Sequence, residues 1–307
     1  MVRASPSSAR ARAHRRKEEA WALGLVLPAF GLFFLFYVVP LGQAVWLSLH
    51  QEDLFGRDLR YSGLENYRQV LADPAFWKSV RTTLLFALMV VPLELLLGLL
   101  AALLVWRPYP GVAFFRTLFF LTTAVPTAVA AVAWGWFLHP VGGYLNHALK
   151  ALGLSPGLSP QPWLTSPELA LPTLAVVTAW AGVGFTAILL TAGLQNIPEE
   201  VLEAASVDGA GPWTRFWRVV LPLLSPTLFL VGLLVLLKSL TAFGQIHLLT
   251  RGGPMESTTV WIYRVYQDAF FNFRFAYAAS EGLLLFLLLV VLAALQFRLL
   301  GGRVHYA

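Results

Sequence analysis

The sequence predicts an all-α, polytopic membrane protein with six transmembrane helices and a helix hairpin on the cytoplasmic side. Hydrophobic residues make up 58% of the chain and charged residues only 12%, a composition far from that of a soluble domain. Six stretches stay apolar for the roughly 20 residues that a helix needs to cross the hydrocarbon core. These stretches are residues 21–48, 79–105, 114–138, 169–193, 223–245 and 277–299.

The orientation of the spans follows from the N-terminal tail, residues 1–20. This tail is rich in Lys and Arg, which stay on the cytoplasmic side when they flank a span. Orientation therefore explains much of the net charge of +6 without a nucleic-acid site. The first apolar run is too long for a signal peptide, so we expect an uncleaved span. Residues 21–299 then form one transmembrane domain, and the C-terminal tail, residues 300–307, returns to the cytoplasm.

The connections between the predicted spans differ in character. Residues 49–78 and 139–168 lie outside in this scheme. The first predicts a loop with short helical pieces, and the second a Pro- and Gly-rich loop that turns or a partner would order. Residues 106–111 form a short cytoplasmic turn. Several prolines and glycines inside the spans are expected to kink helices or to allow close packing. They are Pro92, Pro126, Pro172, Pro226, Gly98, Gly182 and Gly184.

The segment between the fourth and fifth spans, residues 195–222, predicts two short helices outside the membrane. Pro198 suits the first turn of a helix, and the two glutamates after it suit the positive end of the helix dipole. This helix should end near Val207, because Asp208-Gly209-Ala210-Gly211 supplies a flexible link. Pro212 can open a second helix, which we expect at the membrane interface with its tryptophans at headgroup depth. Its apolar stripe would be Trp213, Phe216, Trp217 and Val220, with Arg215 and Arg218 beside it.

The first of these two helices carries a surface suited to a partner protein. Glu200 and Glu203 are three residues apart on one side, and Ala204-Ala205 leaves a low surface next to them. A small-residue face edged with carboxylates fits the groove of a partner. An ordinary polar loop between spans is the alternative interpretation.

The same segment carries a resemblance to a known family. Glu203-Ala204-Ala205, three residues, Gly209, nine residues and Val219-x-Leu221-Pro222 resembles the EAA loop of ABC importer permeases, E-A-A-x3-G-x9-I-x-L-P, with Val219 in place of isoleucine. The resemblance implies a coupling-helix hairpin that docks into a cleft of a cytoplasmic ATPase, where Glu203 would meet a basic group. The implied ATPase-coupling residues are Glu200, Glu203, Ala204, Ala205, Asp208, Gly209, Leu221 and Pro222.

A second resemblance follows the fifth span. Leu249-Thr250-Arg251-Gly252-Gly253-Pro254 resembles the L-T-x-G-G-P segment of carbohydrate-type permeases, in particular the subunit that pairs with a second, different permease. The ending Gln296-Phe297-Arg298 is similar to that of permeases from the maltose and glycerol-3-phosphate importers. By analogy, Gly252, Gly253 and Pro254 would contact the extracytoplasmic binding protein. A plain turn is the alternative.

The resemblance implies the permease subunit of an ABC importer that moves a sugar across the bacterial inner membrane by ATP-driven alternating access. The implied partners are a second permease, two ATPase subunits, a substrate-binding protein and membrane lipid, with no nucleic acid. ATP and Mg would bind the ATPase subunits, because this chain has no G-x-x-x-x-G-K-[ST] motif. We therefore expect no enzyme activity, cofactor or metal site here. The alternatives are the same machine importing glycerol-3-phosphate or another polyol, an ion-coupled secondary transporter and a membrane-embedded enzyme.

Two charged residues lie inside predicted spans, Glu94 in the second and Lys238 in the fifth. A charge at the bilayer centre costs at least a few kcal/mol, so each should face the bundle interior or water. They could form an ion pair along the transport path, or each could face a polar cavity separately. Other candidates offer polar groups for a hydroxyl-rich ligand or rings for a sugar face. These are Trp180, Phe185, Ser239, Thr241, Phe243 and Gln245.

Two further titratable residues lie near predicted span ends. We expect His247 to be a headgroup-level histidine rather than a metal ligand, since no second ligand lies at metal-binding spacing. Glu281 lies near the outer end of the last span, where the depth of the interface would explain a carboxylate.

Overall fold

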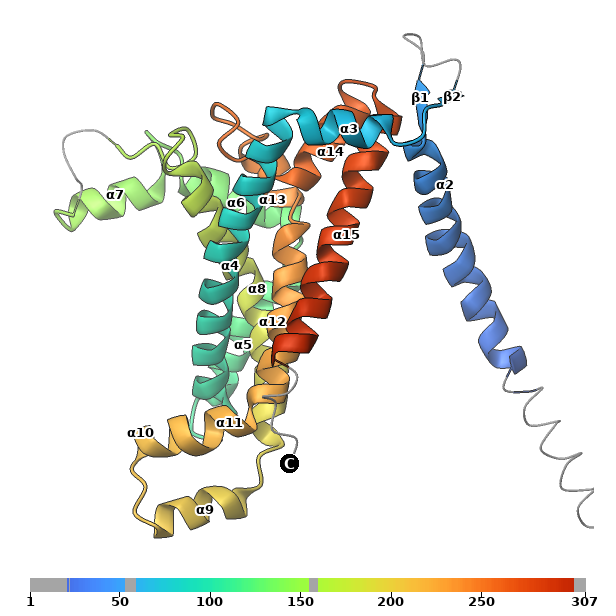
Figure 1. The fold of residues 1–307 in the computed structure, drawn as a ribbon. Helices are drawn as coiled ribbons and strands as arrows, with labels where there is room; N and C mark the ends of the chain where they lie inside the picture. The colour runs from blue at the N-terminus through green and yellow to red at the C-terminus, as the bar shows by residue number, and fades with distance from the viewer. Residues whose placement is uncertain (1–20, 22, 53–58, 155–159, 301–307) are drawn as a thin grey trace, which may run out of the picture.

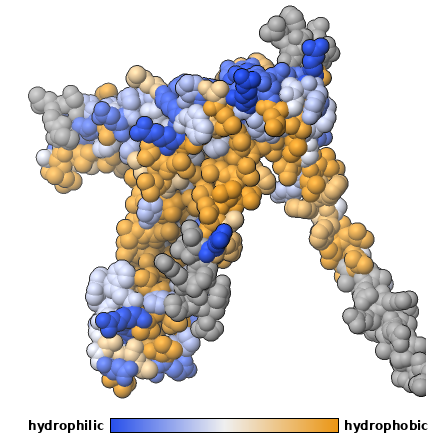
Figure 2. Space-filling view, viewed as in Figure 1, coloured by the Kyte–Doolittle hydropathy of each residue, from blue (hydrophilic) through white to orange (hydrophobic). Residues whose placement is uncertain are grey.

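The fold is known from a computed structural model, which describes residues 21, 23–52, 59–154 and 160–300. The expectations for residues 1–20 and for 301–307 of the C-terminal tail lie outside the described residues, and residue 300 is the last of the final helix. In the described part, five helices are long and apolar enough to cross a membrane, or six when one bent pair counts as a span. The space-filling view shows apolar side chains over the middle of the bundle and polar ones at its two ends (Figure 2). The predicted all-α membrane fold is therefore confirmed.

Four long helices form the bundle, and they stand side by side with a fifth, shorter helix packed on them (Figure 1). Small residues on the second and fourth spans let their backbones approach closely. The bundle helices are α4 (Pro74–Trp106), α8 (Ala170–Gln195), α12 (Ser225–Leu240) and α15 (Phe275–Leu300), and α5 (Val112–Ala124) packs on α8 and α4.

The first span, Leu23–Ser48, diverges from this bundle (Figure 1). It contains a π-helical turn, η1 (Phe34–Val38), followed by α2 (Val39–Ser48). None of its most apolar window is buried, and its contact with the bundle is made by α2 against α15. Ser48, the last residue of α2, is buried.

The third predicted span is not one straight helix. α5 and α6 (Thr127–Phe137) meet at an angle of 104°. Pro126 disfavours the helical conformation at Val125, which is extended at φ −79° and ψ 118°. The expectation of a kink inside one helix over 114–138 is wrong, because the chain breaks and turns at this proline.

The fifth span is also interrupted. α12 ends at Leu240, and the chain resumes as α13 (Gly244–Leu249) after a short break. The second span begins at Pro74 rather than near 79, because the Asp73 side chain caps it by accepting a hydrogen bond from the Ala75 N–H at 2.9 Å.

The connections over 49–78 and 139–168 contain more regular structure than the sequence predicts. A two-stranded antiparallel hairpin, which was not anticipated, pairs β1 (His50–Glu52) with β2 (Leu59–Tyr61) and precedes α3 (Glu65–Ala72). The loop over 139–168 includes α7 (Tyr144–Ala151). Asn146 fastens this loop, donating to Pro140 O at 2.8 Å and accepting from Trp163 Nε1 at 3.0 Å. Within the described part, the chain itself therefore orders this loop.

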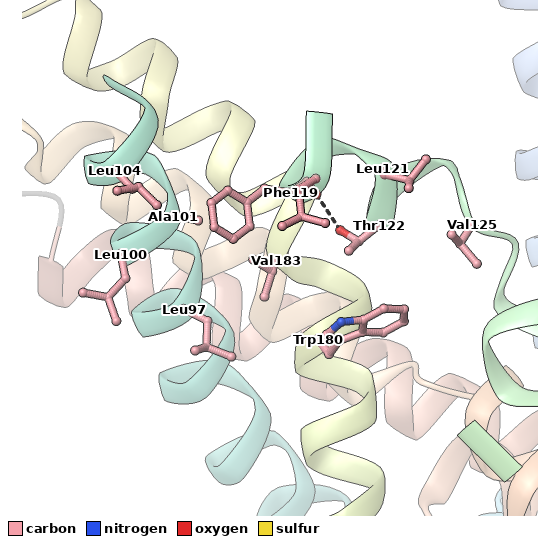
Figure 3. Close-up of a pocket in the computed structure, with 11 residues that line it drawn as sticks. Leu97, Leu100, Ala101, Leu104, Phe119, Leu121, Thr122, Val125, Trp180 and Val183 are labelled. Atoms are coloured by element: carbon pink, nitrogen blue, oxygen red, sulfur yellow. Dashed lines mark hydrogen bonds between the residues drawn. The ribbon is translucent and has the colours of Figure 1, made fainter. Parts of the chain in front are cut away.

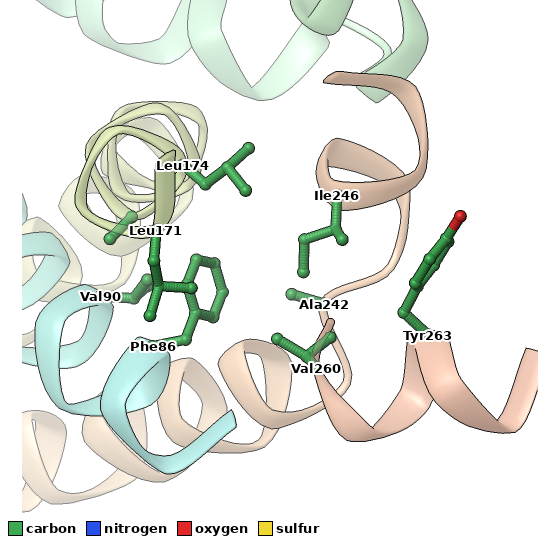
Figure 4. Close-up of a cluster of buried hydrophobic side chains, with 9 residues drawn as sticks. Phe86, Val90, Leu171, Leu174, Ala242, Ile246, Val260 and Tyr263 are labelled. Atoms are coloured by element: carbon green, nitrogen blue, oxygen red, sulfur yellow. The ribbon is translucent and has the colours of Figure 1, made fainter. Parts of the chain in front are cut away.

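Two apolar clusters hold the bundle at different levels. Toward the end opposite the polar hairpin, Phe86, Leu174 and Ile246 meet from α4, α8 and α13 (Figure 4). The helix α14 (Trp261–Phe270) adds Tyr263 to this cluster. At the other end, a second cluster joins the spans to the polar hairpin. It includes Ala102, Leu190, Leu194, Ile197, Leu202, Val220 and Leu224.

Candidate functional site

The predicted hairpin projects from one end of the bundle (Figure 1). Its first helix, α9 (Glu199–Val207), ends before Gly209, whose φ of +79° is readily adopted by glycine. The second arm runs through α10 (Pro212–Arg215), the π-helical turn η2 (Phe216–Val220) and α11 (Leu221–Leu223). The two helices and the non-helical link between them are confirmed. The π turn was not expected.

One side of the hairpin is fixed to the spans. Leu202 of α9 is 5% exposed and Val220 of η2 is 4% exposed, and both belong to the cluster at the ends of α4 and α8. Arg215 also joins the two arms, because its Nη1 donates to the Ser206 hydroxyl at 2.6 Å. The two arms of the hairpin are therefore held together and packed against the ends of α4 and α8.

The opposite side of α9 is open. Glu200, Glu203, Ala204, Asp208 and Gly209 are exposed, and Ala205 is half-buried. None of these carboxylates forms an ion pair with another described residue. Leu221 and Pro222 lie apart, half-buried where the second arm continues toward α12. The first five residues thus form an exposed, acidic, small-residue face, and the last two belong to its support.

The predicted apolar stripe of the second arm is divided. Phe216 and Val220 pack toward the bundle, whereas Trp213 is 73% exposed and Trp217 is 49% exposed. The two indole rings contact each other edge to face, with centroids 5.6 Å apart. The division coincides with the π turn, because its extra residue per turn changes which side chains share a face.

Glu94 and Lys238 lie together in the middle of the bundle. The Lys238 Nζ is 3.3 Å from Glu94 Oε1, and the Thr186 hydroxyl donates to the same oxygen at 3.1 Å. The Glu94 side chain is fully buried and Lys238 is 43% exposed. A Cβ at Gly182 would overlap the carboxylate, so α8 passes directly over it. Glu94 therefore does not face a separate cavity.

The other path candidates do not gather around this pair. Trp180 lines an apolar pocket of about 550 Å³ between α4, α5 and α8 (Figure 3). The hydroxyl in this pocket, that of Thr122, already donates to Phe119 O at 2.8 Å, so the pocket does not suit a hydroxyl-rich ligand. Ser239 is buried and donates to Leu236 O, so its hydroxyl does not face an open path in this structure.

The remaining candidates of the fifth span divide between the interior and the surface. Phe243 stacks on His247 at 5.2 Å, inside a group of aromatic rings. The His247 Nδ1 is buried without a hydrogen-bond partner among the described residues. The ring is therefore packed inside the bundle, two residues before the end of the span Ser225–Leu249. Thr241 is exposed and Gln245 is half-buried, as is expected for groups beside an open face.

The segment with Gly252, Gly253 and Pro254 is a folded turn. Gly252 is buried, because Thr259 donates to its carbonyl at 3.0 Å and Tyr263 leaves no room for a side chain. Gly252 is therefore not accessible to a partner in this structure, whereas Gly253 and Pro254 are half-buried, and their contact with a binding protein stays a prediction. The exposed residues of this turn are Arg251, Met255 and Glu256.

Sequence reasoning missed a charged cluster at the outer end of the bundle. Arg264 of α14 is 13% exposed and contacts Asp73 at 2.5 Å, Glu281 at 2.9 Å and Asp268 at 3.5 Å. Burial lowers the pKa of Arg264, but the three carboxylates outweigh it and raise this pKa above its ordinary value. Glu281 is fully buried within this cluster. The sequence feature that could have indicated this cluster is the i, i+4 spacing of Arg264 and Asp268, which allows an ion pair on a helix.

Apolar spans that carry an exposed, acidic helix hairpin at one end define an integral membrane protein with a surface suited to a partner. The sequence signature described as "Binding-protein-dependent transport system inner membrane component" matches residues 94–306, and this chain belongs to that family.

The similarity extends over nearly the whole chain. The sn-glycerol-3-phosphate transport system permease protein UgpA of Agrobacterium fabrum is 35% identical over 285 residues, 92% of this chain and 95% of that protein. The protein of the same name from Pectobacterium atrosepticum is 34% identical over 285 residues, 92% and 94% of the two chains. A solved bacterial alginate ABC transporter, in complex with an alginate pentasaccharide-bound periplasmic protein, shares the fold. Its TM-score is 0.80 at 22% identity, over 92% of this chain and 95% of that chain.

Family membership decides among the classes of protein that the sequence left open. The chain is the permease subunit of an ABC importer, and its relatives are transport subunits rather than enzymes. This excludes the ion-coupled secondary transporter and the membrane-embedded enzyme.

Proposed function

We propose that this chain pairs with a second, different permease, two ATPase subunits and an extracytoplasmic binding protein to import a sugar or a polyol. The observation that carries the proposal is the two-sided build of α9. One side is packed on the spans through Leu202, and the other presents Glu203 and Ala204 without a partner among the described residues. Such a helix fits the groove of a second protein.

The packing of the hairpin suggests how the motion of the ATPase subunits is transmitted to the spans that line the transport path. ATP favours the closed ATPase pair, and a docked α9 moves with it. Because Leu202 and Val220 tie the hairpin to the ends of α4 and α8, that motion tilts the spans. The path then alternates between inward-facing and outward-facing forms.

The proposed orientation puts the hairpin and both tails in the cytoplasm. Arg107 and Arg215 line one small pocket between the end of α4 and the hairpin, and Arg116 caps Val105 O nearby at 2.8 Å. Basic residues at one end of a bundle support the cytoplasmic side. The turn with Met255 and Glu256 then lies outside, where a binding protein would dock.

The proposed substrate class is inferred from the names of similar permeases. Two permeases at least 34% identical to this chain are named for sn-glycerol-3-phosphate transport. This favours glycerol-3-phosphate, the alternative substrate of the sequence analysis, over a neutral sugar.

Replacing Glu203 by arginine tests the coupling role. We expect ATP-dependent uptake by the complete importer to fall at least tenfold, because a lost charge contact and a new repulsion together cost roughly 2–5 kcal/mol at an interface. The measurement is uptake of labelled glycerol-3-phosphate into vesicles, together with the ATPase subunits retained on purification. Glu168→Arg is the matched control, since Glu168 is exposed near the other end of α8. Unchanged uptake and retention in Glu203→Arg would remove the coupling role.

A further inference from the structure

Lys238 is a half-exposed cation in the middle of a span. It lies midway along Ser225–Leu249, and 43% of its side chain is exposed. An ammonium at this depth cannot face lipid hydrocarbon without a large cost. The side of α12 that carries it must therefore face water or another protein.

The exposed side of the fifth span has a polar middle. Leu230, Leu234 and Leu248 are exposed toward its two ends, and Lys238 and Thr241 are exposed between them. Leu230, Leu234, Lys238 and Thr241 follow one another at three or four residues, which places them along one face of α12, and Leu248 lies beyond the break on α13. Apolar ends with a polar centre suit a face that closes against a second permease and opens to water at mid-depth.

Glu94 holds the ammonium without using all of its donors. The carboxylate is fully buried beneath Gly182 and bonded to Thr186, so it cannot follow Lys238 outward. It neutralises the cation, which reduces the cost of placing that charge in the membrane. The two Nζ contacts to this carboxylate are long, 3.3 and 3.5 Å. Lys238 has three donors, and Glu94 is its hydrogen-bond acceptor among the described residues.

We propose that Lys238 recognises the anionic group of a phosphate monoester as it crosses the middle of the membrane, with Glu94 as a positioning residue. The proposal rests on the proposed function and adds the residue that selects the substrate. Lysine binds phosphate as a compact charge with rotatable donors. A substrate phosphate can take the exposed donors of the ammonium while the buried carboxylate keeps its place.

Chemical modification of Lys238 tests the contact directly. In vesicles that carry the complete importer and its binding protein, methyl acetimidate modifies accessible amines, and peptide mass spectrometry follows each lysine. We expect glycerol-3-phosphate to slow modification of Lys238 about tenfold during ATP turnover, as a charge-assisted hydrogen bond allows, and neutral glycerol to leave it unchanged. Lys150, exposed on α7, is the internal control. An equal rate with and without glycerol-3-phosphate would overturn the proposal.

A paired neutralisation separates recognition from structure. The double variant Glu94→Gln with Lys238→Gln leaves no unpaired charge, so we expect it to assemble like the wild type. Its uptake of glycerol-3-phosphate should fall at least tenfold, as expected for a lost charge-assisted hydrogen bond. Lys238→Arg should retain most of the uptake. Wild-type uptake in the double variant would assign the pair a structural role only and overturn the inference.

The outcomes also separate this inference from the proposed function. If the wild type shows ATP-dependent uptake of neutral maltose but not of glycerol-3-phosphate, the importer stands and the anion site falls. If neither probe enters in an ATP-dependent way and Lys238 is not protected, the proposed function and the inference fall together. Protection of Lys238 that is lost in Glu94→Ala would support the positioning role of Glu94.

Discussion

Replacing Arg264 by methionine is expected to lower the free energy of unfolding by about 3–5 kcal/mol, the usual cost of breaking a buried ion pair from one side. Its guanidinium contacts three carboxylates, two of which are almost or fully buried. Asp268 is 2% exposed and Glu281 is 0% exposed. Without Arg264, Asp268 would keep its ion pair with Arg274, but Glu281 would stay buried with no cation in contact among the described residues.

The cost is large because the cluster joins elements that are distant in sequence. Asp73 caps the start of α4, Arg264 lies on α14 and Glu281 lies on α15. Neighbouring side chains reinforce the cluster, since Tyr277 donates to Asp73 at 3.2 Å and Trp261 to Glu281 O at 3.1 Å. Loss of the guanidinium would therefore loosen the outer ends of three helices together.

Thermal unfolding of the purified chain in detergent measures this effect. Arg68→Met is the matched control, because the Arg68 side chain is 83% exposed and its contact with Glu65 is 3.7 Å long. Such a surface pair contributes only about 0–1 kcal/mol. Arg264→Lys should fall between the two, since lysine keeps the charge but loses the fork that bridges several carboxylates. Equal stability of the Arg264 and Arg68 methionine variants would show that the cluster does not hold the outer end.

Local patterns predicted much of this fold and of the hairpin. The lengths of the apolar runs identified the spans, and Pro198 with the Asp208-Gly209 link located α9 closely. The break at Pro126 was underestimated, because the apolar composition continues through the turn and proline alone does not give the angle. The exposed face around Glu203 was also foreseen, since polarity and helical spacing suffice for it.

Contacts between distant segments could not be predicted in the same way. The positions of Glu94 and Lys238 within their apolar runs predict a similar depth in the bilayer. Their contact, however, depends on how α4, α8 and α12 are rotated about their axes. The Arg264 cluster draws on three separate segments, and only the Asp268 spacing is local. The burial of Gly252 likewise results from Tyr263, which folds over it.

Gly184→Ala is expected to destabilise the bundle, by about 1–3 kcal/mol as for other overpacked cores. α5 crosses α8 at this glycine, and the Gly184 N–H donates to the Thr122 hydroxyl at 3.1 Å. A Cβ here would lie 2.5 Å from the Phe119 carbonyl oxygen and from the hydroxyls of Thr122 and Thr123. A backbone oxygen cannot move aside alone, so the two helices must separate.

The matched substitution on α12 should have the opposite sign. A Cβ at Gly232 would meet its nearest neighbours, side-chain atoms of Gln296 and Leu95, at 3.9 Å. With no overlap, Gly232→Ala gains the helix propensity of alanine, up to about 1 kcal/mol. Thermal unfolding in detergent should therefore place Gly184→Ala below the wild type and Gly232→Ala at or above it. If both variants shifted the unfolding temperature in the same direction, close backbone approach would not be what sets the packing of α5 on α8.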